Sequence, residues 1–217
     1  MKRFCQMTTA IIISFFLFSF IRQNIIRNEI VQANGSVTVD GPVSFGAFTG
    51  NLTLSHTTGT GENQLLLVGV SWGRTTSGTI PRSITLIQFN DTDLDLVVEN
   101  TQDPMNCVAI YRYPGEAPSE VHSQVTITFS TTVNAVVGAI NFAGVDLSDP
   151  IGSISTANGD TSNLMVNLTT NEGELVLDTI SSQYTAGPTG DLRINADASQ
   201  TEHWNTYLDD DKSELGA

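Results

Sequence analysis

The chain of 217 residues carries 9 Lys and Arg against 23 Asp and Glu, which gives a formal net charge of −14 at pH 7. A surface this acidic repels phosphate backbones and anionic lipid headgroups, so the composition argues against nucleic acid or a membrane surface as a partner. The length suits one well-buried domain and is short for two.

The N-terminal residues have the order of a secretory signal. Lys2 and Arg3 precede an apolar stretch, Ala10 to Ile21, and a polar region then runs to Ala33. The apolar stretch is shorter than the roughly twenty residues that a membrane-spanning helix needs. We therefore predict a signal peptide over residues 1–33, cleaved after Ala33, and a protein that is secreted or on the cell surface. The alternative is an uncleaved N-terminal anchor.

Short β-branched or apolar segments, bounded by Gly, Pro, Asn or Asp, follow along the rest of the chain. Several alternate apolar and polar residues, as in Val125-Thr-Ile-Thr-Phe129, which is typical of a half-buried antiparallel strand. The segments predicted in this way are Ser36–Asp40, Leu52–Thr57, Ile84–Phe89, Val121–Phe129, Leu164–Thr169 and Leu175–Ile180.

Two longer apolar runs differ from these strands, because apolar residues there occupy both alternating sets of positions. The first run covers residues 63–72 and the second covers residues 134–145. Such strands are covered on both faces or packed under loops, near the middle of their sheets. Gly69 and Gly138 lie inside the runs, where a glycine costs strand stability and usually marks a bulge or a close backbone approach.

These patterns together predict the fold class. No stretch after the leader keeps a 3.6-residue apolar period for three turns, which excludes parallel α/β folds with crossover helices. We predict an all-β, two-sheet antiparallel β-sandwich, jelly-roll-like, over residues 34–205, preceded by an N-terminal signal helix. Residues 206–217 are an acidic tail or a truncated end. Cleavage after Ala33 would leave Cys107 as the single cysteine of the mature chain. Because one cysteine cannot form an internal disulfide, stability must come from the core.

Six segments of the chain, in order, resemble a secreted β-sandwich module that recurs in bacterial, archaeal and phage surface proteins. The resemblance implies a jelly-roll or lectin-like domain, with adhesion or glycan binding as its expected role. The segments are Leu52-Thr-Leu-Ser-His56, Gly61-Glu-Asn-Gln-Leu-Leu-Leu-Val-Gly-Val-Ser-Trp72, Ala109-Ile-Tyr-Arg-Tyr113, Phe142-Ala-Gly-Val-Asp146 with Pro150, Gly173-Glu-Leu-Val-Leu-Asp178 and Gln200-Thr-Glu-His-Trp204-Asn.

The chain departs from that module in two places. Where such modules usually have a Tyr-Gly-Gly turn, it has Phe89-Asn-Asp-Thr-Asp. Modules of this type also continue beyond the segment around Trp204 into a further apolar strand with a tryptophan, whereas this sequence stops at Ala217. A closing strand is therefore expected either in a longer chain or from another chain acting as a strand donor.

A nucleophile motif occurs once, in Gly69-Val-Ser71-Trp-Gly73. In a hydrolase this serine lies on a strand-to-helix turn, but the residues that follow Gly73 cannot sustain a helix. The histidines His56, His122 and His203 are scattered, and their order with an acid suggests no triad. We predict that Ser71 is a strand residue and that the protein is not an enzyme.

Acidic clusters raise the question of calcium. Asp91-Thr-Asp93-Leu-Asp95 begins like a calcium loop but lacks the glycine at position six and the glutamate at position twelve, so a solvent face is the preferred interpretation. Asp146 and Asp149 follow the second apolar run, where a loop could hold a structural calcium. The alternative there is a turn whose aspartates cap backbone amides. We predict no other cofactor.

Aromatic side chains on a concave sheet or at a loop rim could form a platform for a sugar ring, because pyranose rings stack on flat side chains. Trp204, Tyr207 and Tyr184 are the candidates, with the alternative that Trp204 covers the core. The function predicted is a non-catalytic extracellular module that binds a glycan or a surface protein. The alternatives are an envelope or filament subunit completed by strand addition, and a glycan-active enzyme with a facing carboxylate pair.

Overall fold

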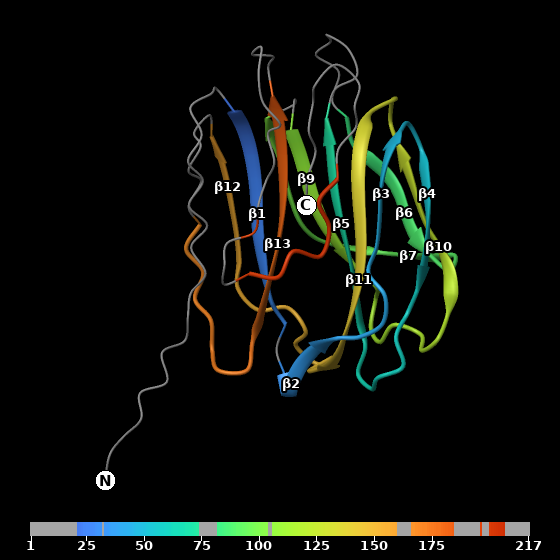
Figure 1. Cartoon of the computed structure of the whole chain (residues 1–217), viewed down its shortest axis with the longest axis vertical. Helices are drawn as coiled ribbons and strands as arrows, with labels where there is room; N and C mark the ends of the chain where they lie inside the picture. The colour runs from blue at the N-terminus through green and yellow to red at the C-terminus, as the bar shows by residue number, and fades with distance from the viewer. Residues whose placement is uncertain are drawn as a thin grey trace.

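The computed structural model describes residues 21–31, 33–73, 82–103, 106–159, 166–184, 196 and 200–206, with side chains described over the same ranges except residues 21–35, 103 and 183–184. These residues form β-strands and no helix (Figure 1). Accordingly, the described residues include no helix with the length and apolar character needed to cross a membrane.

Two antiparallel sheets form a sandwich. The four-stranded sheet consists of β4 (Leu52–Thr57), β6 (Ile84–Phe89), β7 (Thr92–Asp93) and β10 (His122–Phe129) in the order β4-β10-β6-β7. The central sheet consists of β2 (Ala33–Val39), β3 (Ser44–Thr49), β5 (Leu65–Gly73), β8 (Asp95–Asp103), β9 (Asn106–Arg112) and β11 (Asn134–Val145). Its order is β2-β11-β5-β9-β8, and β3 also pairs with β11.

A small third sheet lies against the other face of the central sheet (Figure 1). It is formed by β1 (Ile21–Val31), β12 (Ile154–Gly159) and β13 (Leu175–Tyr184), and β1 is the middle strand. The predicted sandwich is thus present, with an additional layer. The physical reason is the one that the two apolar runs suggested: β5 and β11 carry buried side chains on both faces, so both faces need a cover.

The core between the central and four-stranded sheets follows from strict alternation. Along β5, Leu66, Val68 and Val70 face the four-stranded sheet, and Trp72 continues this row. The facing residues alternate in the same way along β4, β6 and β10; they are Leu52, Leu54, Ile87, Phe89, Val125, Ile127 and Phe129. A second cluster fills the space on the opposite face of the central sheet, where Leu177 of β13 packs with Val108 and Ile110 of β9.

Most predicted strands are confirmed, two of them at both ends, namely Leu52–Thr57 and Ile84–Phe89. The strand predicted over Leu164–Thr169 is wrong in its described part, since residues 166–170 are not in a strand. The alternation of apolar and polar residues predicts one buried and one exposed face, but it does not ensure that a neighbouring strand is available for pairing. The predicted signal helix lies outside the described residues except for Ile21, and the polar region after it forms β1.

Candidate functional site

The outward face of the four-stranded sheet is lined by polar side chains in rows. Because β4 and β10 alternate, burial of Leu54 and Val125 leaves Ser55 and Gln124 on the outer side. Antiparallel pairing sets Ser55 opposite Gln124, and on the next strand it sets Gln88 opposite Thr126. The same alternation that builds the core therefore aligns hydroxyl and amide groups across three neighbouring strands.

A tight hairpin adds a carboxylate beside these rows. Asn90 and Asp91 join β6 to β7 with positive φ values of 51° and 59°, which is the backbone of a type I′ turn. Asn and Asp tolerate this region better than other non-glycine residues. The departure from the Tyr-Gly-Gly turn therefore still gives a two-residue hairpin, and it exposes Asp91. Near the end of β6, Gln88 Nε2 donates to Asp93 Oδ1 at 2.7 Å.

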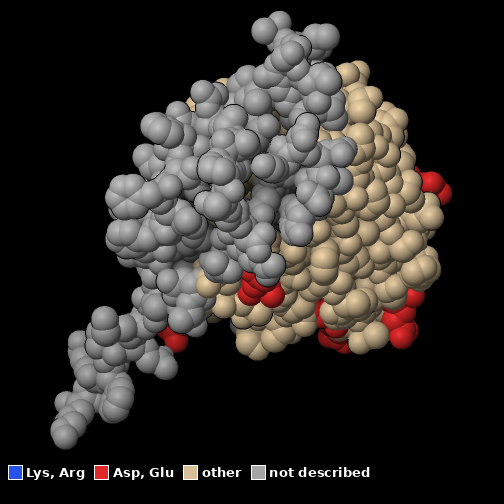
Figure 2. Space-filling model, turned by 45° about the horizontal axis from the view of Figure 1, so that its top comes forward, with Lys and Arg blue, Asp and Glu red and all other residues tan. Residues whose placement is uncertain are grey.

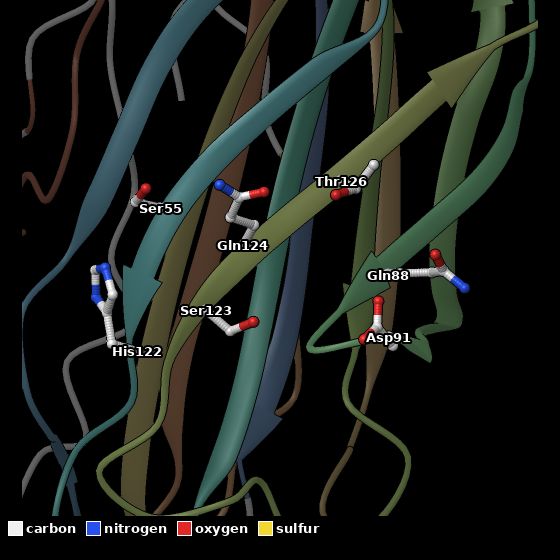
Figure 3. A pocket seen from close by; sticks show the side chains of 7 residues that line it. All are labelled: Ser55, Gln88, Asp91, His122, Ser123, Gln124 and Thr126. Atoms are coloured by element: carbon white, nitrogen blue, oxygen red, sulfur yellow. The ribbon is translucent and has the colours of Figure 1, made fainter.

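These side chains line a groove of about 410 Å³ (Figure 3). Its lining combines hydroxyl, amide, imidazole and carboxylate groups from β4, β10, β6 and the hairpin turn, and the residues are Ser55, Gln88, Asp91, His122, Ser123, Gln124 and Thr126. The Thr57 hydroxyl lies 2.7 Å from His122 Nδ1, so this ring nitrogen already has a hydrogen-bond partner. The described lining contains one carboxylate, that of Asp91.

Ser71 lies in the interior of β5, as predicted, and is fully buried. Its hydroxyl donates to the Ile180 carbonyl of β13 at 3.3 Å. The Gly-x-Ser-x-Gly match is thus part of a strand, and the serine contacts the small sheet rather than an open cleft.

His56 belongs to a buried polar network at one end of the core. Asn141 Nδ2 donates to Gln64 Oε1 at 3.2 Å, so the Asn141 oxygen accepts from His56 Nε2 at 2.7 Å. His56 Nδ1 then accepts from the Ser44 hydroxyl at 3.0 Å. Gln64 Nε2 donates to the Gly59 and Gly61 carbonyls, which fixes the loop before β5. Burial lowers the pKa of His56, against the opposing effect of its bond to Asn141, and nearby His122 lowers it further.

The aromatic platform predicted from the sequence is described only in part. Trp204 is 4% exposed and packs in the second core cluster. It therefore covers the core, which was the alternative to a sugar platform. It lies over two glycines that face each other across β5 and β11: an added Cβ on Gly138 would lie 2.3 Å from Trp204 Cε2, and one on Gly69 would lie 3.3 Å from Cζ2. Tyr184 ends β13 with its side chain outside the described set, and Tyr207 lies outside the described residues.

Asp146 and Asp149 lie in the turn after β11. Asp146 Oδ1 accepts hydrogen bonds from the Ser148 hydroxyl at 2.6 Å and from the Ser148 backbone N–H at 3.0 Å, and Asp149 N–H donates to the Asp146 carbonyl. The side-chain bond from Ser148, with its backbone bond, lowers the pKa of the Asp146 carboxyl. This is the geometry of a capping turn. In the described part of the chain, no three His, Cys, Asp or Glu side chains group to hold a metal, and calcium at this turn stays a prediction.

The acidic residues do not gather into one patch on the face seen in Figure 2, where the Asp and Glu atoms form separate groups among uncharged surface. Asp91, Asp93 and Asp95 are likewise divided: the first lies in the hairpin turn, the second bonds Gln88, and the third lies 3.6 Å from Arg112. The preferred interpretation of this cluster as solvent-exposed holds for Asp91, Asp93 and Asp95, all of which are exposed.

Sequence reasoning missed most of the groove. Ser55, Gln88, Gln124 and Thr126 are individually ordinary, and the available signal was their place on the polar side of alternating strands. That signal does not give the order of the strands, which decides which polar residues become neighbours. Comparisons with family models, with curated proteins and with solved structures found no match to this chain. The resemblance to a secreted surface module therefore stays a prediction.

Proposed function

We propose that the chain is a non-catalytic β-sandwich module that binds a glycan in the groove on the outward face of its four-stranded sheet. The observation that carries the proposal is the lining of the groove, in which all seven side chains can donate or accept hydrogen bonds. A sugar presents closely spaced hydroxyl groups that are both donors and acceptors. Hydroxyl, amide and carboxylate side chains held on a rigid sheet match that pattern.

The charge of the protein narrows the class of glycan. The chain has a net charge of −14, and the groove itself contains the carboxylate of Asp91. Sulfated or uronic-acid glycans would be repelled, so a neutral glycan is favoured. The seven lining residues include no Trp, Tyr or Phe, so the sugar would be held by hydrogen bonds rather than by stacking.

We also propose that the sandwich is a jelly roll. The support is the pairing of strands: β3 with β11, β4 with β10, β5 with β9 and β6 with β7. The first strand of this set pairs with the last, the second with the next to last, and so on, as in a long hairpin rolled into two sheets. Jelly rolls include lectins, which favours the glycan proposal by analogy of fold alone.

A glycan array gives the first test, read at millimolar calcium with and without chelator. We expect binding to neutral oligosaccharides in both conditions, because Asp146 and Asp149 do not line the groove. The best ligand is then titrated by NMR into the isotope-labelled protein. Gln124→Ala and Asp91→Asn are each expected to weaken binding about tenfold, since each removes a hydrogen-bonding group from the contact.

Thr85→Ala is the matched control, because Thr85 is exposed on the same sheet and does not line the groove. It is expected to bind as the unmodified chain does. Absence of binding to every neutral glycan, or equal binding by the Gln124→Ala variant and the unmodified chain, would contradict the proposal. Binding that disappears with chelator would instead favour the calcium site predicted at Asp146 and Asp149.

We propose a secreted or cell-surface location, for which the support is the basic and apolar N-terminal sequence that begins at Lys2 and Arg3. Fractionation of cells that express the whole chain tests it. The protein is expected outside the cytoplasm, and recovery in the cytoplasm alone would contradict the proposal.

A further inference from the structure

The middle strand of the small sheet, β1, lies within residues 1–33, the segment predicted to be a cleaved signal peptide. Within the described chain, β12 and β13 each pair with β1 and with no other strand. β1 pairs with β12 from Gln23 to Asn28 and with β13 from Ile21 to Val31. Cleavage after Ala33 would take away all of β1 and leave β12 and β13 without a partner strand.

The small sheet also covers apolar side chains of the central sheet. Leu177 of β13 packs in a cluster with Val108 and Ile110, which are fully buried. On the other side of β1, Asn100 Nδ2 donates to the Ala157 carbonyl of β12. Loss of β1 would therefore leave two separate strands with unpaired edges over an apolar face, and unpaired strand edges favour aggregation.

The composition of β1 suits a strand that is kept. Five of its eleven residues are Ile or Val, which favour strands. It also carries Arg22 and Arg27 against Glu29, so its net charge of +1 is opposite in sign to the net charge of −14 of the whole chain, which favours its retention weakly.

We infer that residues 21–33 remain in the folded protein, so that any removal of N-terminal residues ends before Ile21. The occupant of the position between β12 and β13 is the chain's own β1. Because one residue separates β1 from β2, this strand is present at a high effective concentration, which a strand donated by another chain cannot match.

The mature N-terminus tests the inference directly. The whole chain is produced in a host that exports it, and the folded protein is examined by intact mass and N-terminal sequencing. A first residue at or before Ile21 is expected. A folded protein that begins at any residue from Arg22 to Asn34 would overturn the inference.

A disulfide test in the full chain examines the place of β1. Ile25 is the register partner of Ala157, so Ile25→Cys with Ala157→Cys is expected to form a disulfide in a Cys5→Ser background, detected by mass spectrometry of the digest. The control combines Ile25→Cys with Ser155→Cys, which is two residues out of register and is expected to cross-link far less. A folded protein with no Ile25–Ala157 cross-link, or with equal yields for the two pairs, would overturn the inference.

Discussion

On the face of the central sheet that meets the four-stranded sheet, large side chains interlock, whereas the opposite face is interrupted by Gly69 and Gly138. The first face buries Trp72, Phe89 and Phe129 in one cluster, and Phe89 makes edge contacts with the His56 and Tyr113 rings. Buried polar side chains next to this cluster, such as that of His56, are joined in a hydrogen-bond network.

The opposite face is closed by different means. Trp204 lies over the two glycines, and the buried Thr179 Oγ1, Ser181 Oγ and Trp204 Nε1 have no hydrogen-bond partner among the described residues. From this difference we expect the sandwich core to carry most of the stability, and the small sheet with the Trp204 segment to separate more easily.

Truncation of one large side chain on each face makes the strongest comparison. Phe89→Ala is expected to lower the free energy of unfolding by about 4 kcal/mol, because it leaves a large cavity in a fully buried site. Leu177→Ala, at 8% exposure beneath the small sheet, is expected to cost about 2 kcal/mol. Urea unfolding measures both, and equal losses would contradict the difference between the faces.

The glycine pair tests the close approach of Trp204. Gly138→Ala is expected to cost about 1–3 kcal/mol, because its Cβ would overlap the Trp204 ring and the side chain must move. Gly69→Ala is the matched control, since its Cβ meets the same ring at 3.3 Å, and it is expected to cost less. A red shift of tryptophan fluorescence in a Trp72→Phe background reports the movement. Equal stability of the two variants would count against the packing described.

The pH dependence of stability tests the polar network on the sandwich side. The pKa of His56 is lowered in the folded protein, so the unfolded chain binds more protons below its ordinary value of about 6.5. The contribution of neutral His56 to stability is therefore fully present above about pH 6.5. It is lost as the pH falls from there through the lower pKa of the folded protein. The unfolding free energy measured at pH 7.5 and 5.5 is expected to fall less in His56→Gln than in the unmodified chain.

His203, whose pKa burial also lowers, and the carboxylates are present in both proteins, so the difference between them isolates His56. An identical fall in both proteins would show that His56 is not linked to unfolding. This effect is expected to be smaller than those of the truncations, because the histidine keeps its hydrogen bonds in either protonation state if the Ser44 hydroxyl rotates.

The faces of the central sheet also show how far sequence reasoning reached. Apolar residues on both faces of β5 and β11 were enough to predict cover on both sides. Gly69 and Gly138 were predicted to mark a bulge or a close backbone approach, whereas the structure pairs them in regular register beneath the Trp204 ring. The covering groups could not be predicted, because Trp204 is far from Gly138 in sequence and no local pattern joins them. The groove was missed for the same reason, since Gln88 and Gln124 become neighbours only through the order of strands.

The signal peptide predicted over residues 1–33 stays a prediction, and the part of it that forms β1 shows a different limit of sequence reasoning. A polar stretch with scattered Ile and Val after an apolar run fits a processing site, and it fits an irregular strand equally well. Local composition cannot separate the two, because what distinguishes them is whether β12 and β13 lie ready to pair with it.

Ser71 gives the smallest expected effect and separates two roles of one side chain. Its hydroxyl makes a single 3.3 Å bond from the central sheet to the Ile180 carbonyl, so Ser71→Ala is expected to cost about 0.5–1 kcal/mol in urea unfolding. Ser55→Ala, in the groove on the exposed side of β4, is the control and is expected to leave stability within about 0.5 kcal/mol. If Ser71 were a nucleophile, the substitution would abolish an esterase activity and leave unfolding unchanged. A measurable loss of stability with no change in ester hydrolysis is instead what a residue joining two sheets should give, because its oxygen is buried and already bonded.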